Sequence, residues 1–266
     1  MLGQISNDRG SDSNTLERES VYSRWDGNGF KRLVHTEKRI PPTALIAFHA
    51  LRDHIRDENF SCIGAKAALS GEYFRTGFYS EMNSAFTTQT LAGDLTSFVK
   101  EQAVAPGSNY TSFAAIFAAP QIEDELSWEK LLWKQLNNLH ALDAQDFDWD
   151  PTVSGDPADP TFSFSFASTG FFIVGLNPQS SRLARRFPWA TMVFNPHAQF
   201  QRLREAKQFD RLQQTIRARE MALQGTLNPN LSSFGELSEA RQYSGRPVDE
   251  KWKCPFHSLR AKLALK

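Results

Sequence analysis

The protein has 266 residues, of which 40% are hydrophobic and 23% are charged, an ordinary composition for a globular chain that excludes disordered and collagen-like classes. Lysine plus arginine and aspartate plus glutamate number 30 each, so the formal net charge is 0. No overall field therefore favours nucleic acid or an anionic membrane. Two cysteines are too few for a disulfide scaffold or a four-cysteine zinc site, and we expect reduced thiols in a cytoplasmic protein.

The first 20 residues are rich in serine, asparagine, aspartate and glycine, and they lack the apolar central region of a secretory signal. They predict a flexible tail, because so few apolar groups cannot offset the entropy of ordering. Residues 21–266 are predicted to form a single domain. The longest apolar runs fall well short of the roughly 20 residues that a membrane helix needs, so no membrane partner is expected.

Apolar residues at helical spacing predict four helices. The first begins at Pro41. Charged residues lie between its apolar residues, so this helix is predicted to be amphipathic. The second and third cover residues 90–102 and 122–143, the third with acidic residues at its start that suit the helix dipole. A long fourth helix is predicted over residues 195–224. The third helix carries a leucine stripe made of Leu126, Leu131, Leu132, Leu136 and Leu139.

Strands are predicted at residues 111–120, 161–167, 170–178 and 189–196, and the second and third form a hairpin because they are so close in sequence. In the second strand, Phe162, Phe164 and Phe166 alternate with serines, which places three phenyl rings on one buried face. Strands and helices do not alternate regularly. The sequence therefore predicts an α+β fold, with an antiparallel sheet and helices packed on it.

The chain lacks the phosphate-loop, dinucleotide-binding, HExxH, GxSxG and CxxCH motifs. Among its histidines, His197 has the most informative context. Asn195 is predicted as a helix N-cap and Pro196 as the first helical residue, so His197 falls in the first turn, three residues before Phe200. The imidazole is then expected to point inward and to stay neutral, as a metal ligand must. A core histidine with no ligand role fits the same spacing. A single histidine cannot make a zinc site, but it can ligate haem iron.

Eight arginines lie between residues 182 and 219. Their planar guanidinium groups can form bidentate pairs with carboxylates, so some of them could clamp haem propionates. Arg182 and Arg186 are the candidates, because they follow a buried strand. Arg211, Arg217 and Arg219 fit a solvated helix face better. The acidic residues within this segment argue against a nucleic-acid partner.

The roles of Cys62 and Asp156 each allow two readings. Cys62 is flanked by apolar and small residues, which suits either a packed thiol or a thiolate ligand. Cys254 lies near the C-terminus, where we expect Trp252 and Phe256 to dock the tail. Asp156 precedes a proline in an acidic loop that could meet a cationic substrate, although turn capping explains the same residue more simply.

Several ordered blocks resemble the YqcI/YcgG family, which includes haem-dependent N-hydroxylases of guanidine-bearing amino acids, among them enzymes of D-cycloserine and guanitoxin biosynthesis. The resemblance spans about residues 45–257. The blocks are residues 60–66, 156–166, 175–188, 193–204, 238–245 and 254–256. The family often has proline at Ser61 and histidine at Asn177. Asparagine cannot replace imidazole as a haem ligand, so His197 is the histidine that remains within these blocks, with Cys62 as its rival.

The resemblance implies that residues 21–266 form a haem-binding catalytic domain with a pocket between sheet and helices. The expected function is a haem b monooxygenase that hydroxylates a guanidine or amine nitrogen of a small amino acid such as L-arginine or a derivative. His197 would ligate the iron, Arg182 and Arg186 the propionates, and the three phenylalanines would wall the porphyrin. Glu239 would anchor the guanidinium, with Asp156 as a second carboxylate for the substrate.

No flavin or nicotinamide motif is present, so electrons are expected from a separate reductase acting with O2, or from peroxide. Two alternatives remain. One is a haem-binding or haem-sensing protein without turnover, and the other is a cofactor-free module whose aromatic pocket takes an apolar ligand.

Overall fold

Seven strands form one sheet within residues 20–104, 110–232 and 235–257, which the computed structural model describes. The order across the sheet is β2-β1-β3-β4-β7-β6-β5. The strands are β1 (Ser23–Trp25), β2 (Phe30–Arg32), β3 (Phe74–Glu81), β4 (Ser112–Ala119), β5 (Phe164–Phe166), β6 (Thr169–Leu176) and β7 (Ala190–Pro196). Of the predicted flexible tail, residues 1–19 lie outside this description. Ser20 is described, and its hydroxyl donates to Asp94 at 2.6 Å.

The sheet is antiparallel except for the pairing of β3 with β4. The chain connects these two parallel strands through α4 (Ala85–Val104). The predicted α+β class is therefore confirmed, whereas the sheet, which was predicted to be antiparallel, contains one parallel pair. The hairpin of β5 and β6 is confirmed as well. It turns at Ala167 and Ser168, both with positive φ, the geometry that matches the twist of paired strands.

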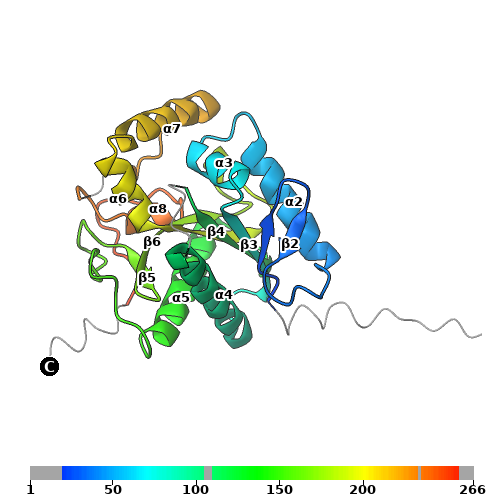
Figure 1. The fold of residues 1–266 in the computed structure, drawn as a ribbon. Helices are drawn as coiled ribbons and strands as arrows, with labels where there is room; N and C mark the ends of the chain where they lie inside the picture. Colours follow the sequence, from blue (N-terminus) through cyan, green and yellow to red (C-terminus); the bar gives the residue numbers. More distant parts are fainter. Residues whose placement is uncertain (1–19, 105–109, 233–234, 258–266) are drawn as a thin grey trace, which may run out of the picture.

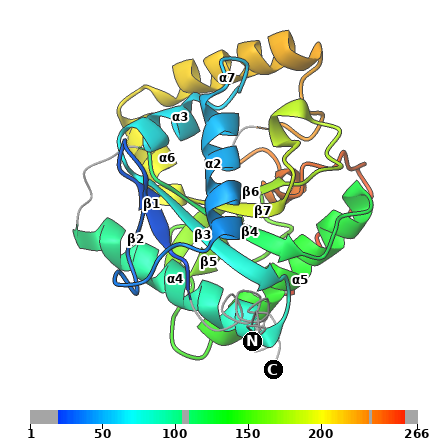
Figure 2. The same ribbon diagram turned by 90° about the vertical axis from the view of Figure 1, so that its right-hand side faces the viewer.

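Helices cover both faces of the sheet (Figures 1 and 2). The helices α4 and α5 (Glu125–Asp143) pack on one face, and α2 (Pro42–Arg56) and α3 (Ile63–Ser70) pack on the other. Each face has its own apolar core. After α5, the chain also forms the short helix η1 (Leu183–Arg185) and the helices α6 (His197–Glu205), α7 (Phe209–Gln224) and α8 (Ala240–Tyr243).

The third predicted helix shows how local sequence sets an element. Asp124 accepts the Ser127 amide at 2.6 Å while the Ser127 hydroxyl accepts the Asp124 amide, so a capping box starts α5. Of the predicted leucine stripe, three members are buried against the sheet, Leu131 is half-buried, and Leu126 is 46% exposed. The buried stripe is completed by two tryptophans, so that the packed face comprises Trp128, Leu132, Trp133, Leu136 and Leu139.

The predicted single helix over residues 195–224 is wrong, because the chain breaks it into α6 and α7. Lys207 adopts a left-handed backbone with φ of 56°, which an α-helix cannot continue through. The Gln208 amide bonds the Leu203 carbonyl at 2.8 Å, closing the end of α6. Asn195 is not the N-cap, since it lies in β7 and Pro196 holds the cap position. The left-handed residue at Lys207 therefore changes the direction of the chain, so that α7 does not continue along the axis of α6 (Figure 1).

None of the helices in the described part of the chain has the length and apolar character needed to cross a membrane.

Close packing of α5 on β6 gives a stability test. A methyl group at Gly175 would lie 2.9 Å from both Leu132 and Trp128. We expect Gly175→Ala to lower the free energy of unfolding by roughly 1–3 kcal/mol, the usual effect of overpacking. Urea unfolding followed by circular dichroism measures it.

Gly93 supplies the matched control, since it lies exposed in α4 and a methyl group there would meet nothing within 4 Å. Gly93→Ala is expected to raise stability by roughly 0.5–1 kcal/mol through helix propensity. Equal effects of the two substitutions would contradict the packing of α5 on β6.

Candidate functional site

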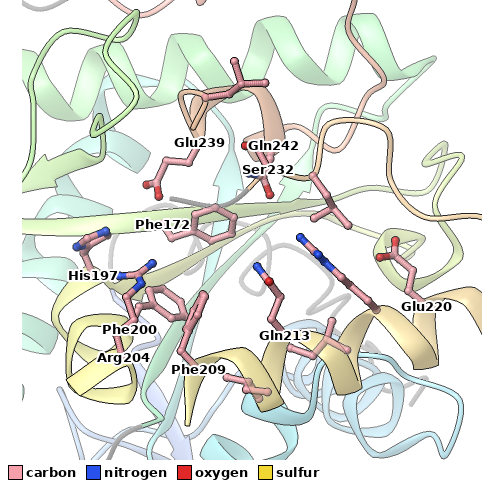
Figure 3. A pocket seen from close by; sticks show the side chains of 15 residues that line it. Phe172, His197, Phe200, Arg204, Phe209, Gln213, Glu220, Ser232, Glu239 and Gln242 are labelled. Carbon is pink, nitrogen blue, oxygen red and sulfur yellow. The ribbon is translucent and has the colours of Figure 1, made fainter. Parts of the chain in front are cut away.

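An apolar cavity lies where α6, α7 and the chain before α8 meet β6 (Figure 3). Its volume is about 200 Å³. The helix α7 contributes an apolar wall of Phe209, Leu212 and Ile216, and Phe172 of β6 forms the opposite side. The polar groups on the wall include His197, Arg204, Gln213, Arg217, Glu239 and Gln242.

A second cavity of about 250 Å³ adjoins the first. Both are lined by Phe172 and Phe200 and by the apolar face of α7, and we call the two together the α7 cleft. The second part extends to Cys62 at the start of α3 and to Arg185 of η1. Each cavity alone is smaller than the roughly 300–1,000 Å³ that ligand pockets commonly have, and the shared lining places the two side by side.

His197 is the first residue of α6, and it is only 1% exposed. The pKa of its imidazole is lowered to about 4, mainly by burial and also by the nearby Arg204 cation, while Asp150 acts in the opposite direction. The imidazole is thus neutral at physiological pH. The structure therefore gives His197 the inward position and neutral state expected from the sequence, although burial rather than the helix start is the main cause.

Glu239 lies just before α8, and its carboxylate points into the cavity (Figure 3). Its Oε1 accepts hydrogen bonds from the Ser163 hydroxyl and from the Tyr243 hydroxyl, the latter at 2.8 Å. Burial raises the pKa of the carboxyl to about 7, against the lowering effect of these bonds and of Arg204. Near neutral pH this group can accept a proton or bind a cation.

The three phenylalanines of the hairpin strand do not wall the cleft. Phe162, Phe164 and Phe166 are all buried in the core that faces α4 and α5. Of the intervening serines, Ser163 contacts the site by bonding Glu239, and Ser165 accepts the Asp150 amide at 2.9 Å. The predicted alternation is correct, but the sheet is covered on both faces, and the polar face of the strand is the one turned to the site.

The two arginines predicted to bind propionates lie outside the cleft. Arg182 is buried and bonds Glu220 at 2.6 Å and the carbonyl of Thr226 at 2.6 Å, so its guanidinium ties α7 to η1. Arg186 is exposed, and it donates to the Ser180 carbonyl at 2.9 Å. The cations on the cleft wall are instead Arg204, Arg217 and Arg185.

Arg185 holds the far end of the cleft to α8. It donates to the Gln242 carbonyl at 2.7 Å and to the Tyr243 carbonyl at 3.2 Å. Burial lowers its pKa to about 10, so it is still a cation at neutral pH. Cys62 lies near it and lines the same part of the cleft, where burial raises the pKa of the thiol and keeps it protonated.

Asp156 lies outside the cleft. It is exposed, and its Oδ1 accepts the Ala158 amide at 2.9 Å, which is the turn-capping role that the sequence also allowed. Cys254 is a partly buried thiol whose pKa burial raises to about 12. Phe256 and Trp252 pack against Trp133, as expected for docking of the C-terminal segment.

Sequence reasoning missed several residues of the site, notably Phe172, Arg204, Gln242 and Tyr243. A signal existed for Tyr243, since it lies four residues after Glu239 and so on the same side of a helical turn. Arg204 has no such signal, because its approach to Glu239 depends on how α6 crosses the sheet.

Within the described residues, no three histidine, cysteine, aspartate or glutamate side chains come together as a metal-binding group. Haem asks for less, since one or two side chains suffice as iron ligands.

The model of the YqcI/YcgG family matches residues 51–257. The chain therefore belongs to that family. It is also similar to the protein named "Uncharacterized protein YqcI" of Bacillus subtilis (strain 168), at 26% identity over 245 residues, which cover 86% of this chain and 93% of the relative. No solved structure gives a significant match.

The raised pKa of Glu239 has a consequence for stability. Folding favours the protonated acid, so the contribution of this group falls as pH rises from its ordinary pKa of 4.5 through about 7. Glu239→Gln keeps an acceptor oxygen and removes the charge. We expect the variant to exceed wild type in free energy of unfolding by roughly 2–3 kcal/mol at pH 8, with the difference vanishing below about pH 4.

Urea unfolding across this pH range measures the difference. Glu205→Gln is the control, because Glu205 is exposed on α6 and its substitution is expected to leave the pH profile unchanged. Parallel curves for wild type and Glu239→Gln would contradict the burial of an ionisable carboxyl at this position.

Proposed function

We propose that the protein is a haem b-dependent monooxygenase that hydroxylates a guanidine or amine nitrogen of a small amino acid, with L-arginine or a derivative as the first candidate. One observation carries the proposal: a neutral, buried histidine and a buried carboxylate lie on the wall of one apolar cleft. The resemblance of the matched blocks to haem-dependent N-hydroxylases supplies the reaction class.

The residues of the α7 cleft suit a porphyrin in three ways. Its walls are predominantly apolar and aromatic, as a planar hydrophobic macrocycle requires. His197 provides a neutral imidazole as an iron ligand, with Cys62 at the other end as its rival. Arg204 and Arg217 take the place of Arg182 and Arg186 as partners for the propionates.

When bound, haem would supply the activation of oxygen, for which no side chain of the cleft is equipped. The chain's own residues would bind and orient the substrate. The Glu239 carboxylate would accept the guanidinium in a charge-assisted pair, with Ser163 and Tyr243 fixing the direction of its oxygens. The phenyl rings of Phe172, Phe200 and Phe209 would exclude water from the reacting nitrogen. Electrons come from a separate reductase with O2, or from peroxide.

The cofactor proposal is tested by titrating the purified protein with hemin and recording the visible spectrum. We expect a saturable Soret band. His197→Ala is expected to change the ferric and ferrous carbon monoxide spectra, whereas Cys62→Ser leaves them unaltered. The reverse pattern would assign the ligand to Cys62, and no band in wild type would refute haem binding.

The substrate proposal is tested on the haem-loaded protein with arginine analogues and a reducing system. Mass spectrometry is expected to find a product heavier by one oxygen atom. Because a guanidinium binds the ionised form of Glu239, the KM for arginine should fall as pH rises through about 7, and Glu239→Gln should raise it by at least tenfold. Oxygen-dependent use of reductant without any oxygenated product would favour a haem-binding or haem-sensing role.

A further inference from the structure

A column of three aromatic side chains runs from the back of the cleft to the surface. Tyr243 stacks on Trp133 of α5, with ring centroids 5.5 Å apart and an interplanar angle of 20°. Trp133 in turn contacts Trp252 at a centroid distance of 6.3 Å. Tyrosine and tryptophan are among the residue types whose side chains lose single electrons most readily in proteins at neutral pH. The column therefore joins oxidisable rings without a gap.

The inner end of the column lies directly behind the cleft wall. The ring of Phe172, which lines both parts of the cleft, meets the Tyr243 ring edge to face at 5.6 Å. Glu239, whose carboxylate points into the cavity in Figure 3, is the nearer of two acceptors for the Tyr243 hydroxyl, at 2.8 Å, and the Phe171 carbonyl lies at 3.1 Å. Tyr243 itself is fully buried, so it is separated from the cleft by a single layer of side chains.

The Tyr243 hydroxyl has an acceptor for its proton. A tyrosine that loses one electron must also lose its phenolic proton, because the oxidised phenol is a strong acid. The Tyr243 hydroxyl lies 2.8 Å from Glu239 Oε1, and its oxygen accepts the Phe164 amide at 3.2 Å, which fixes its position. Burial raises the pKa of Tyr243 well above its ordinary value and that of Glu239 to about 7, so near neutral pH the phenol keeps its proton while the carboxylate can take one.

The outer end of the column reaches solvent. Trp133 is 1% exposed, whereas Trp252 is only partly buried and has the guanidinium of Arg241 at 5.6 Å from its ring centroid. Trp252 is therefore the member of the column that a reagent in solution can approach. Tight packing alone would explain three neighbouring aromatic rings, but it would require neither a carboxylate on the phenol nor an exposed end.

We propose that Tyr243 is a redox-active tyrosine, with Glu239 as its proton acceptor and with Trp133 and Trp252 as its electron connection to solvent. A one-electron oxidant in the cleft takes an electron from Tyr243, and the phenolic proton moves to Glu239 Oε1. This leaves a neutral tyrosyl radical and a carboxylic acid. An electron from a reductant in solution, such as a thiol or ascorbate, then passes through Trp252 and Trp133, and the proton returns to the phenol.

The natural oxidant rests on the proposed function, since oxygen activation in the cleft would provide it. A relay of this kind protects a monooxygenase when no substrate fills the cleft. The oxidising equivalent leaves through the column and is quenched at the surface, and the side chains of the cleft are spared.

The relay can be tested without haem, so its outcome is independent of the proposed function. Photoexcited ruthenium tris-bipyridine, with a cobalt(III) pentaammine chloride as irreversible electron acceptor, yields a one-electron oxidant in solution. Ruthenium(III) is reduced to ruthenium(II), the Tyr243 hydroxyl becomes a tyrosyl radical and Glu239 gains the proton. Samples frozen after the flash are examined by electron paramagnetic resonance, with circular dichroism to confirm that each variant is folded.

We expect a tyrosyl signal in wild type that falls at least threefold both in Tyr243→Phe and in Trp252→Phe. Trp189→Phe is the matched control, because Trp189 is also partly buried but packs with Phe187 on the other face of the sheet, and it should keep the wild-type signal. Glu239→Gln retains a hydrogen-bond acceptor but takes up no proton. It should replace the tyrosyl signal by a tryptophan radical, an effect that a purely structural role would not produce.

A tyrosyl signal that persists in Tyr243→Phe would place the radical on another of the five tyrosines and overturn the proposal. Persistence in Trp252→Phe would overturn the electron connection, and persistence in Glu239→Gln would overturn the role of the carboxylate. A protein that binds no hemin but passes these tests would refute the proposed function and leave the redox tyrosine in place. A protein that binds hemin but fails these tests would overturn the redox tyrosine and leave the proposed function in place.

Discussion

The hydrogen bonds that Ser163 and Tyr243 donate to Glu239 hold the site together. A carboxylate that is 6% exposed is expensive to leave without donors, and these two supply them from different parts of the chain. Ser163 precedes β5 at the edge of the sheet, while Tyr243 belongs to α8. The same contact therefore docks α8 on the hairpin, closes the cleft at one end and orients the charged group. Arg185 adds to it by binding the last carbonyls of α8.

Much of the fold could be predicted from sequence wherever the apolar pattern is regular. The helices that became α2, α4 and α5 and the strands β4, β6 and β7 all show such a pattern, and each is present. The strand β3 was missed because it interrupts its apolar residues with Arg75, Thr76 and Gly77. Arg75 is nevertheless buried, since Glu101 of α4 binds it at 2.7 Å. A pairing between distant residues leaves no trace in local periodicity.

The candidate site was predictable in part for the same reason. His197 and Glu239 were singled out and do lie on one cleft, because a helix start and a matched block constrain them locally. Arg182 lies outside the cleft because it bonds Glu220, a partner 38 residues away that no local pattern connects to it. The phenyl rings of Phe162, Phe164 and Phe166 lie away from the cleft for a different reason. Their alternation defines two faces of a strand, but which face meets the site depends on the helices that cover the sheet on each side.

The elbow at Lys207 separates two tasks that one continuous helix would combine. The helix α6 is anchored to β6 and β7, whereas α7 packs chiefly on α3, α6 and η1 rather than on a strand. Substitutions in α7 can therefore change the dimensions of the cleft. The sheet and α6, which lie beneath it, would stay unaltered. Replacements in this single peripheral helix would therefore alter the size and lining of the cavities without disturbing the strands.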